Sequence, residues 1–218
     1  MTEQVGNDYD AMAAGSGEAG EFSATYWEDR YRGHAAHGSR PPNPQLVSEA
    51  GDLVPGTALD AGCGEGADAR WLASRGWRVT AVDVAPTALR RAREHAAAIG
   101  PDVASRIDWV AADLTTWAPP AEHFDLVSAH YVHPAGPHDT FVRRLAAAVA
   151  PGGTLLVVGH DPSDRHSAGH VTAGEVAAGL DGDRWDVVVA EVRSRHVAGH
   201  GGAEITLRDA VLRACRRP

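Results

Sequence analysis

The chain has 218 residues and 44% of them are apolar, so it can bury one sizeable core and is neither disordered nor fibrous. Its 29 acidic residues outnumber its 20 basic residues and give a formal charge of −9, which argues against a general electrostatic grip on nucleic acid or on anionic membranes. All of the basic residues are Arg, which excludes any mechanism that needs a catalytic or Schiff-base Lys.

The N-terminal part of the chain divides into a tail and a helical segment. Residues 1–21 are acidic, rich in Gly, Ala and Ser, and lack periodicity, so we predict a disordered tail. Residues 22–54 contain two predicted helices, at 22–32 with Ser23 as N-cap and at 45–54. We expect these helices to cap the functional site of a single domain that covers residues 22–218.

Strands and helices alternate along the rest of the chain. Apolar runs that end in turns predict seven strands, at residues 57–62, 77–84, 106–113, 124–130, 154–160, 185–197 and 203–217. Predicted helices lie between them, at residues 66–76, 86–99, 140–150 and 172–180. This order predicts an α/β fold, a Rossmann-like, doubly wound and mostly parallel sheet in a three-layer αβα sandwich, with a C-terminal antiparallel hairpin.

A Gly-rich turn follows the first predicted strand. Small residues there let the backbone approach a ligand closely, and the helix that follows offers unpaired N–H groups. Gly62, Gly64 and Ala67 also fit the dinucleotide pattern GxGxx(G/A), so the turn alone does not separate a nicotinamide enzyme from other users of nucleotides.

Three acidic residues at the ends of successive strands distinguish a nicotinamide enzyme from other users of nucleotides. Asp60 suits a ligand with a cationic ammonium group, because pyrophosphate binders favour neutral residues at the entrance of the turn. Asp83 lies where a carboxylate can hold both ribose hydroxyls, and Asp113 where one can accept a hydrogen bond from an adenine amino group. Each Asp alone is more simply a helix N-cap or turn residue. Together they describe S-adenosylmethionine better than NAD.

With these residues, the sequence resembles the class I S-adenosylmethionine-dependent methyltransferases over roughly residues 23–217. The motifs that carry the resemblance are ALDAGCGEG (58–66), VTAVDVAPTAL (79–89), WVAADL (109–114), FDLVSAHYVH (124–133) and LAAAVAPGGTLLVVGHD (145–161). Within that superfamily, YWEDRYR (26–32), RPPNPQLV (40–47) and SRGWRVTAVD (74–83) are similar to a small bacterial group related to thiol, halide and tellurite-resistance methyltransferases.

The resemblance implies a set of cofactor-binding residues. Residues at the methionine end would be Asp60, Gly62, Cys63 and Gly64; residues at the ribose and adenine would be Asp83, Val84, Ala112, Asp113 and Leu114; residues near the sulfonium would be Ala129 and His130. Trp27 and Arg32 would cover the cofactor, and Arg32 would pair with its carboxylate. Related sequences tend to have Gln or Asn in place of His130, and a Trp near Gly38 or Ser39. Both differences fall on the substrate side, so the family's substrates are not carried over.

The candidate acceptor-side residues are mainly histidines, of which the chain has twelve. Methyl transfer from a sulfonium depends on holding both reactants in near-attack geometry. It needs a general base only if the acceptor carries a tightly held proton. The candidates for catalysis are His130, Tyr131 and His133, and those for substrate binding are Asn43, His133, His160, His166, His170, His196 and His200. We expect these seven histidines, from His130 to His200, on one rim of the sheet; His34, His37, His95, His123 and His138 are read as surface or loop residues.

Four of these histidines form two H-x-A-G-H patterns, at residues 166–170 and 196–200. Three interpretations of these patterns stay open: unrelated loop histidines, a His-lined acceptor pocket, or a metal site. No Cys or carboxylate completes a clear ligand set, so we expect no metal. Cys63 lies in a tight turn, where packing explains a small residue better than reactivity does.

The sequence therefore predicts an enzyme that transfers a methyl group from S-adenosylmethionine, by in-line displacement, to an S, N or O nucleophile of a small molecule. One alternative is an NAD(P)-dependent oxidoreductase, against which Asp60, Asp113 and the lack of room for a substrate domain argue. The other is a metal-binding or cofactor-sensing protein that keeps the nucleotide site. Two distant cysteines and no signal peptide or long apolar run predict a cytoplasmic protein, a monomer or homodimer, without nucleic-acid or membrane partners.

Overall fold

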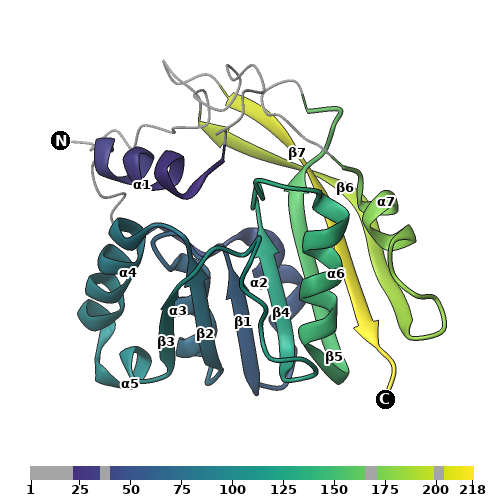
Figure 1. Cartoon of the computed structure of the whole chain (residues 1–218), viewed down its shortest axis with the longest axis horizontal. Coiled ribbons are helices and arrows are strands. Elements are labelled where there is room, and N and C mark those ends of the chain that lie inside the picture. The colour runs from purple at the N-terminus through teal and green to yellow at the C-terminus, as the bar shows by residue number, and fades with distance from the viewer. Residues whose placement is uncertain (1–21, 35–39, 165–170, 199–203) are drawn as a thin grey trace.

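The computed structural model describes residues 22–34, 40–164, 171–198 and 204–218 (Figure 1). The predicted tail at residues 1–21 lies outside this part of the chain. The strands are β1 (Thr57–Ala61), β2 (Arg78–Asp83), β3 (Ile107–Ala111), β4 (Phe124–His130), β5 (Val149–His160), β6 (Trp185–Ala198) and β7 (Glu204–Arg216). The helices are α1 (Ala24–Gly33), α2 (Pro44–Ala50), α3 (Ala67–Ser74), α4 (Pro86–Ile99), α5 (Pro101–Ala104), α6 (His138–Ala148) and α7 (Ala173–Ala178).

The strands form one seven-stranded sheet in the order β3-β2-β1-β4-β5-β7-β6. The first five strands pair in parallel, whereas β7 pairs antiparallel with both β5 and β6. The predicted doubly wound, mostly parallel sheet with a C-terminal hairpin is thereby confirmed. The chain runs outward from β1 to β3 and then returns to β4 beside β1, so the strand order reverses between β1 and β4 (Figure 1).

Helices cover both faces of the sheet because successive strand residues point to opposite sides. On one face, Leu59, Val127 and Leu155 pack with Phe141 and Leu145 of α6. On the other face, Leu126 and Leu156 join a second buried cluster that includes Leu46 of α2 and Leu72 of α3. The strands are therefore enclosed between two apolar layers, as the predicted αβα sandwich requires.

Charged side chains attach α2 to the C-terminal hairpin. Asp209 of β7 is fully buried and accepts hydrogen bonds from Nε of Arg195 at 2.8 Å and from Nε2 of Gln45 at 3.2 Å. Arg193 of β6 pairs with Glu49 of α2 at 2.6 Å. A buried carboxylate is tolerated only when it is paired, and these contacts supply the pairing while they hold α2 against the sheet.

The main differences from the predicted elements concern two strands and two helices. Strand β5 begins at Val149 and not at residue 154, because Val149 pairs with Phe124 ahead of an irregularity in the β4–β5 register. Strand β3 ends at Ala111, since the Asp113 carboxylate accepts the Thr115 N–H at 2.8 Å and starts a turn. Helix α2 ends at Ala50 rather than at residue 54, and the short helix α5 was not predicted.

We predict that Leu156→Ala lowers the free energy of unfolding by about 2–5 kcal/mol, because Leu156 is 1% exposed between β4 and β7 and its loss leaves a cavity. Urea denaturation measures the change. The control is Val54→Ala, a residue that is 85% exposed, for which we expect a change within about 0.5 kcal/mol. Equal midpoints for the two variants would contradict this description of the core.

Candidate functional site

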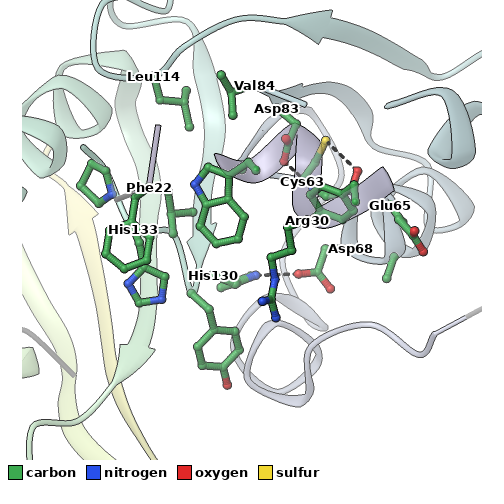
Figure 2. Close-up of a pocket in the computed structure, with 18 of the residues that line it drawn as sticks. Phe22, Arg30, Cys63, Glu65, Asp68, Asp83, Val84, Leu114, His130 and His133 are labelled. Carbon is green, nitrogen blue, oxygen red and sulfur yellow. Dashed lines mark hydrogen bonds and ion pairs between the residues drawn. The ribbon is translucent and has the colours of Figure 1, made fainter. Parts of the chain in front are cut away.

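The main cavity lies above the carboxyl ends of the parallel strands, beneath α1. Its volume is about 370 Å³, which is in the range of small-molecule sites. The turns that follow β1 and β4 line it, so it opens at the reversal of strand order, where open α/β sheets bind their ligands. Figure 2 shows side chains from both halves of the sheet and from α1 pointing into this space.

The Gly-rich turn after β1 approaches its neighbours too closely for larger residues. Gly62 and Gly64 have φ angles of 76° and 53°, in the left-handed region that favours Gly. A Cβ on Gly64 would lie 2.7 Å from the Tyr31 hydroxyl, and a Cβ on Gly62 would lie 2.5 Å from Val132. Small residues in this turn therefore let α1 and the loop after β4 close over it.

Two buried carboxylates lie at this turn. Asp83 accepts the Gly64 N–H at 2.8 Å and the Ala85 N–H at 2.9 Å. Burial nevertheless raises the pKa of Asp83 above its usual value. Burial and the neighbouring charges of Asp68 and Asp83 raise the pKa of Asp60 much further, and its Oδ2 has no hydrogen-bond partner among the described residues. An added cation would relieve this excess of buried negative charge.

The predicted adenine side is brought together as a group. Residues of this group that line the cavity are Val84, Ala112, Asp113 and Leu114. Cys63 also lines it, and burial together with the Asp83 charge raises the pKa of its thiol, so the thiol stays protonated. A protonated thiol is a poor nucleophile, which agrees with a packing role for Cys63.

Helix α1 contributes a different Arg from the predicted one. Trp27 lines the cavity as expected, but Arg32 does not: its side chain is 67% exposed and pairs with Glu28 at 2.9 Å, one helical turn away. Arg30 and Tyr31 line the cavity instead. Burial, and then the Asp83 charge, raise the pKa of Tyr31 far above its usual value, so its hydroxyl is a neutral hydrogen-bonding group.

A clasp of hydrogen bonds holds α1 against α4. The Glu28 carboxylate accepts the Thr87 N–H at 2.9 Å and the Thr87 hydroxyl at 2.7 Å, which caps the N-terminus of α4. Desolvation opposes ionisation of Glu28, but these bonds and Arg32 outweigh it and lower the pKa of Glu28. Arg91 of α4 adds a bond to the backbone carbonyl of His34 at 2.9 Å.

At the end of β4, His130 is held by a residue that sequence reasoning missed. Its Nδ1 lies 2.7 Å from Oδ2 of Asp68, in the first turn of α3. The other oxygen of Asp68 accepts the backbone N–H of Asn43 at 2.6 Å, and the Asn43 side chain caps α2. Nε2 of His130 has no partner among the described residues, although the side chain is only 5% exposed. Leaving such a group unpaired costs about 1–3 kcal/mol, which a ligand can recover.

The other acceptor-side candidates also line the cavity. Tyr131 has a left-handed φ of 53°, unusual for a residue with a side chain, and its ring stacks on His160 at 4.5 Å. Burial lowers the pKa of His160, which keeps it neutral near pH 7. His133 stacks on Phe22 at 4.9 Å, at the end of α1 where the two rings form an aromatic wall (Figure 2).

Besides Arg32, three predicted residues within the described part of the chain do not line the cavity. Asp60 is buried beneath it, and Ala129 packs in the core because its side chain faces the opposite side of β4 from His130. His196 lies within β6, bonds to Thr206 of the hairpin, and is separated from β5 by β7. His196 nevertheless lies near the carboxyl end of β6, which runs parallel to β5, so it stands on the predicted rim of the sheet without reaching the cavity. His166, His170 and His200 lie outside the described residues.

Within the described ranges, no group of three or more His, Cys, Asp or Glu side chains could hold a metal ion. None of the described helices combines the length and the apolar character that a bilayer crossing requires.

Other residues that sequence reasoning missed also surround the cavity. They come from α1, the loop before α2, and α3: Arg30, Tyr31, Arg40, Asp68 and Arg70. Arg70 is almost fully buried, and its Nη1 has no partner in the described chain. Asp68 and Arg70 could have been predicted from their position, because they lie in the first helical turn after the Gly-rich turn. Side chains there surround the ligand that the Gly-rich turn would bind.

Residues 58–153 match the family model described as a methyltransferase domain. The trans-aconitate 2-methyltransferase of Paracidovorax citrulli is 36% identical over 141 residues, which cover 63% of this chain and 50% of that protein. The ubiquinone biosynthesis O-methyltransferase of Methylobacterium sp. strain 4-46 is 30% identical over 169 residues, which cover 72% of this chain and 66% of that protein. The chain thus spans between half and two thirds of the length of these curated relatives.

The fold matches solved methyltransferases as well. The N-methyltransferase NodS of Bradyrhizobium japonicum, solved with S-adenosylhomocysteine, superposes with a TM-score of 0.64 over 89% of this chain and 98% of that chain, at 22% identity. The predicted superfamily is confirmed by these comparisons. The narrower resemblance to thiol, halide and tellurite-resistance enzymes stays a prediction.

We predict that Glu28→Gln loosens α1, because the uncharged amide accepts weaker hydrogen bonds from Thr87 and no longer pairs with Arg32. Amide hydrogen exchange over residues 24–33 should become several-fold faster, while β1 keeps its protection. In the native protein the protection of these amides, corrected for the intrinsic pH dependence of exchange, should decrease as the pH falls through the lowered pKa of Glu28, since protonation removes the same charge. The control is Glu94→Gln, on the exposed side of α4. Equal exchange in both variants would contradict the clasp.

Proposed function

We propose that this chain, which belongs to the class I S-adenosylmethionine-dependent methyltransferases, transfers a methyl group from that cofactor to a small molecule. The observation that carries the proposal is the convergence of the Gly-rich turn with buried carboxylates at the reversal of strand order. Asp60 supports it most directly, because its Oδ2 is buried without a partner among the described residues, and burial together with the charges of Asp68 and Asp83 raises its pKa.

The residues present fit S-adenosylmethionine. Asp60 would face its ammonium group, Asp83 its ribose hydroxyls, and Asp113 its adenine amino group, with Val84 and Leu114 beside the ring. Trp27 would cover the bound cofactor. Arg30 and Arg70, rather than Arg32, are the cations available for its carboxylate.

When bound, S-adenosylmethionine supplies an electrophilic methyl group on a sulfonium. The chain's own residues orient the two reactants and exclude water. Helix α1 covers the cavity, the turn after β4 provides the acceptor side, and the clasp at Glu28 keeps the cover in place. No covalent intermediate on the enzyme is needed, so the absence of Lys from the chain is no obstacle.

The acceptor is a small molecule that reacts through an S, N or O atom. A cavity of about 370 Å³ has room for the cofactor and a compact acceptor but not for a folded partner. The net charge of −9 disfavours nucleic acid. The named substrates of relatives include trans-aconitate and intermediates of ubiquinone biosynthesis, both small molecules. The cytoplasmic location and the monomeric or homodimeric state remain predictions.

The two alternatives fail on different grounds. An NAD(P)-dependent oxidoreductase would bring a pyrophosphate towards Asp60, and like charges would repel. A cofactor sensor without turnover would share the nucleotide site but would not need acceptor-side residues such as His130 at the cavity wall.

We predict that S-adenosylmethionine and S-adenosylhomocysteine bind in calorimetric titrations and that NAD and NADP do not. Asp83→Asn should weaken S-adenosylhomocysteine binding roughly 10- to 100-fold, the value of losing charge-assisted hydrogen bonds to the ribose. The matched control is Asp108→Asn, on the exposed side of β3, for which we expect unchanged binding of S-adenosylhomocysteine. Binding of NAD or NADP in place of S-adenosylhomocysteine would reverse the proposal.

A second prediction follows from the raised pKa values of Asp60 and Asp83. In mildly acidic solution part of this pair carries a proton, and a bound ammonium and ribose favour the charged forms. Binding of S-adenosylhomocysteine should therefore release protons, and the release should vanish at alkaline pH, where both groups are already ionised. Calorimetry in buffers of different ionisation enthalpy measures it. Proton uptake, or an unchanged release in Asp60→Asn, would argue against the ammonium site.

A further inference from the structure

The hydrogen bonds around Asp68 fix the orientation of His130. One carboxylate oxygen of Asp68 lies 2.7 Å from Nδ1 of His130, and the other accepts the Asn43 N–H at 2.6 Å. The carboxylate is thus held between the end of β4 and the start of α2, from its own place on α3. Neither the carboxylate nor the imidazole can rotate without breaking one of these bonds.

This arrangement also selects the imidazole tautomer. An ionised carboxylate only accepts hydrogen bonds, so Nδ1 of neutral His130 carries the proton and Nε2 carries the lone pair. Nε2 has no partner among the described residues, and His130 lines the cavity. The group that completes its hydrogen bonding is therefore a donor from a ligand, such as a hydroxyl.

We propose that Asp68 positions His130 to take the proton from a phenolic hydroxyl, so that the methyl acceptor is a phenol. This inference rests on the proposed methyltransferase function and specifies its substrate class. The O–H bond breaks as its proton moves to Nε2 of His130, and its electron pair stays on oxygen. The oxygen forms a bond to the methyl carbon, whose former bonding pair stays with sulfur. Asp68 then faces an imidazolium, whose charge it balances.

Acidity favours a phenol over other acceptors. An ordinary imidazole has a pKa of about 6.5 and a phenol one of about 10, a gap that a positioned base can bridge as the oxygen attacks. An alcohol is much less acidic than a phenol, and the gap between its pKa and that of an imidazole is too wide for a positioned base to bridge. Halides carry no proton, and aromatic thiols have largely lost theirs near neutral pH, so neither needs His130 as a base.

The charges around this pair favour an oxygen that becomes negative. Figure 2 shows Arg30 extending from α1 towards Asp68 and His130. Charged and titratable groups on the elements packed around His130 are Arg30 and Tyr31 of α1, Asp60 of β1, Asp68 and Arg70 of α3, Tyr131 after β4, and His160 of β5. The guanidinium groups of Arg30, Arg40 and Arg70 line the same cavity as His130, so a cation that does not hold the cofactor's carboxylate would stabilise a developing phenolate.

The test compares oxygen and sulfur acceptors on the same ring. Methyl transfer from S-adenosylmethionine is measured with a panel of phenols and matched aromatic thiols that includes 2-naphthol and naphthalene-2-thiol. His130→Gln keeps a hydrogen bond to Asp68 but cannot take a proton. It should lower transfer to the phenols about 100-fold or more and change transfer to the thiols less than about 3-fold. Exposed controls are His123→Asn and Asp139→Asn, which should match the native enzyme.

Asp68→Asn tests the positioning role separately. The new amide can donate to Nδ1, which moves the imidazole proton to Nε2 and removes the acceptor lone pair. Nitrogen chemical shifts of labelled His should show the Nδ1-protonated tautomer in the native protein and the inverted one in the variant.

Loss of S-adenosylhomocysteine binding in the native protein would defeat the methyltransferase proposal itself. If S-adenosylhomocysteine binds, three results overturn the phenol proposal alone: no phenol in the panel is methylated, His130→Gln keeps the native rate with phenols, or Nδ1 of native His130 is unprotonated. If a variant no longer binds S-adenosylhomocysteine, the tautomer of His130 in the native protein decides.

Discussion

Strands β1 and β4 lie side by side in parallel, but the chain continues from them towards opposite edges of the sheet. Among the described segments, no crossover connection covers the space above their carboxyl ends, and the site depends on this gap. The Gly-rich turn enters it from β1, and His130 and Tyr131 enter it from β4. Helix α1, clasped to α4, closes it from above. A different strand order would keep the apolar layers but separate the two halves of the cavity.

Charge is distributed unevenly around that gap. Carboxylates lie beneath the Gly-rich turn, where burial raises the pKa values of Asp60 and Asp83. Arg30, Arg40 and Arg70 lie around the cavity wall. A ligand with a cationic and an anionic end is complementary to both, as S-adenosylmethionine is. The protein keeps unfavourable buried charge without the ligand and recovers part of that free energy on binding, which couples binding to stability.

Most of the fold was predictable because Gly and Pro mark its boundaries: Pro86 begins α4, Gly100 ends it, and the capping box at Thr172 begins α7. The cofactor side followed from the spacing of residues at strand ends. The Asp68–His130 pair did not, because its members are 62 positions apart and meet only when the fold brings the first turn of α3 to the end of β4. Sequence likewise could not show that Arg30 faces the cavity while Arg32 pairs with Glu28, since both lie on one helix. His196 stands on the predicted rim, but sequence could not show that β7 inserts between β5 and β6 and separates His196 from the cavity.

That insertion has a consequence for synthesis on the ribosome. Strand β7 is translated after β6 but lies between β5 and β6, so the open edge of β5 has no neighbour until residues 204–216 have emerged. Until then a long apolar strand edge is available to other nascent chains. The Asp209 carboxylate, on which Arg195 and Gln45 depend, arrives in the same late segment. The sheet is therefore completed, and α2 attached to the hairpin, in one late step of folding, after β7 has been synthesised. Before that step, chaperones would have to protect the edge of β5.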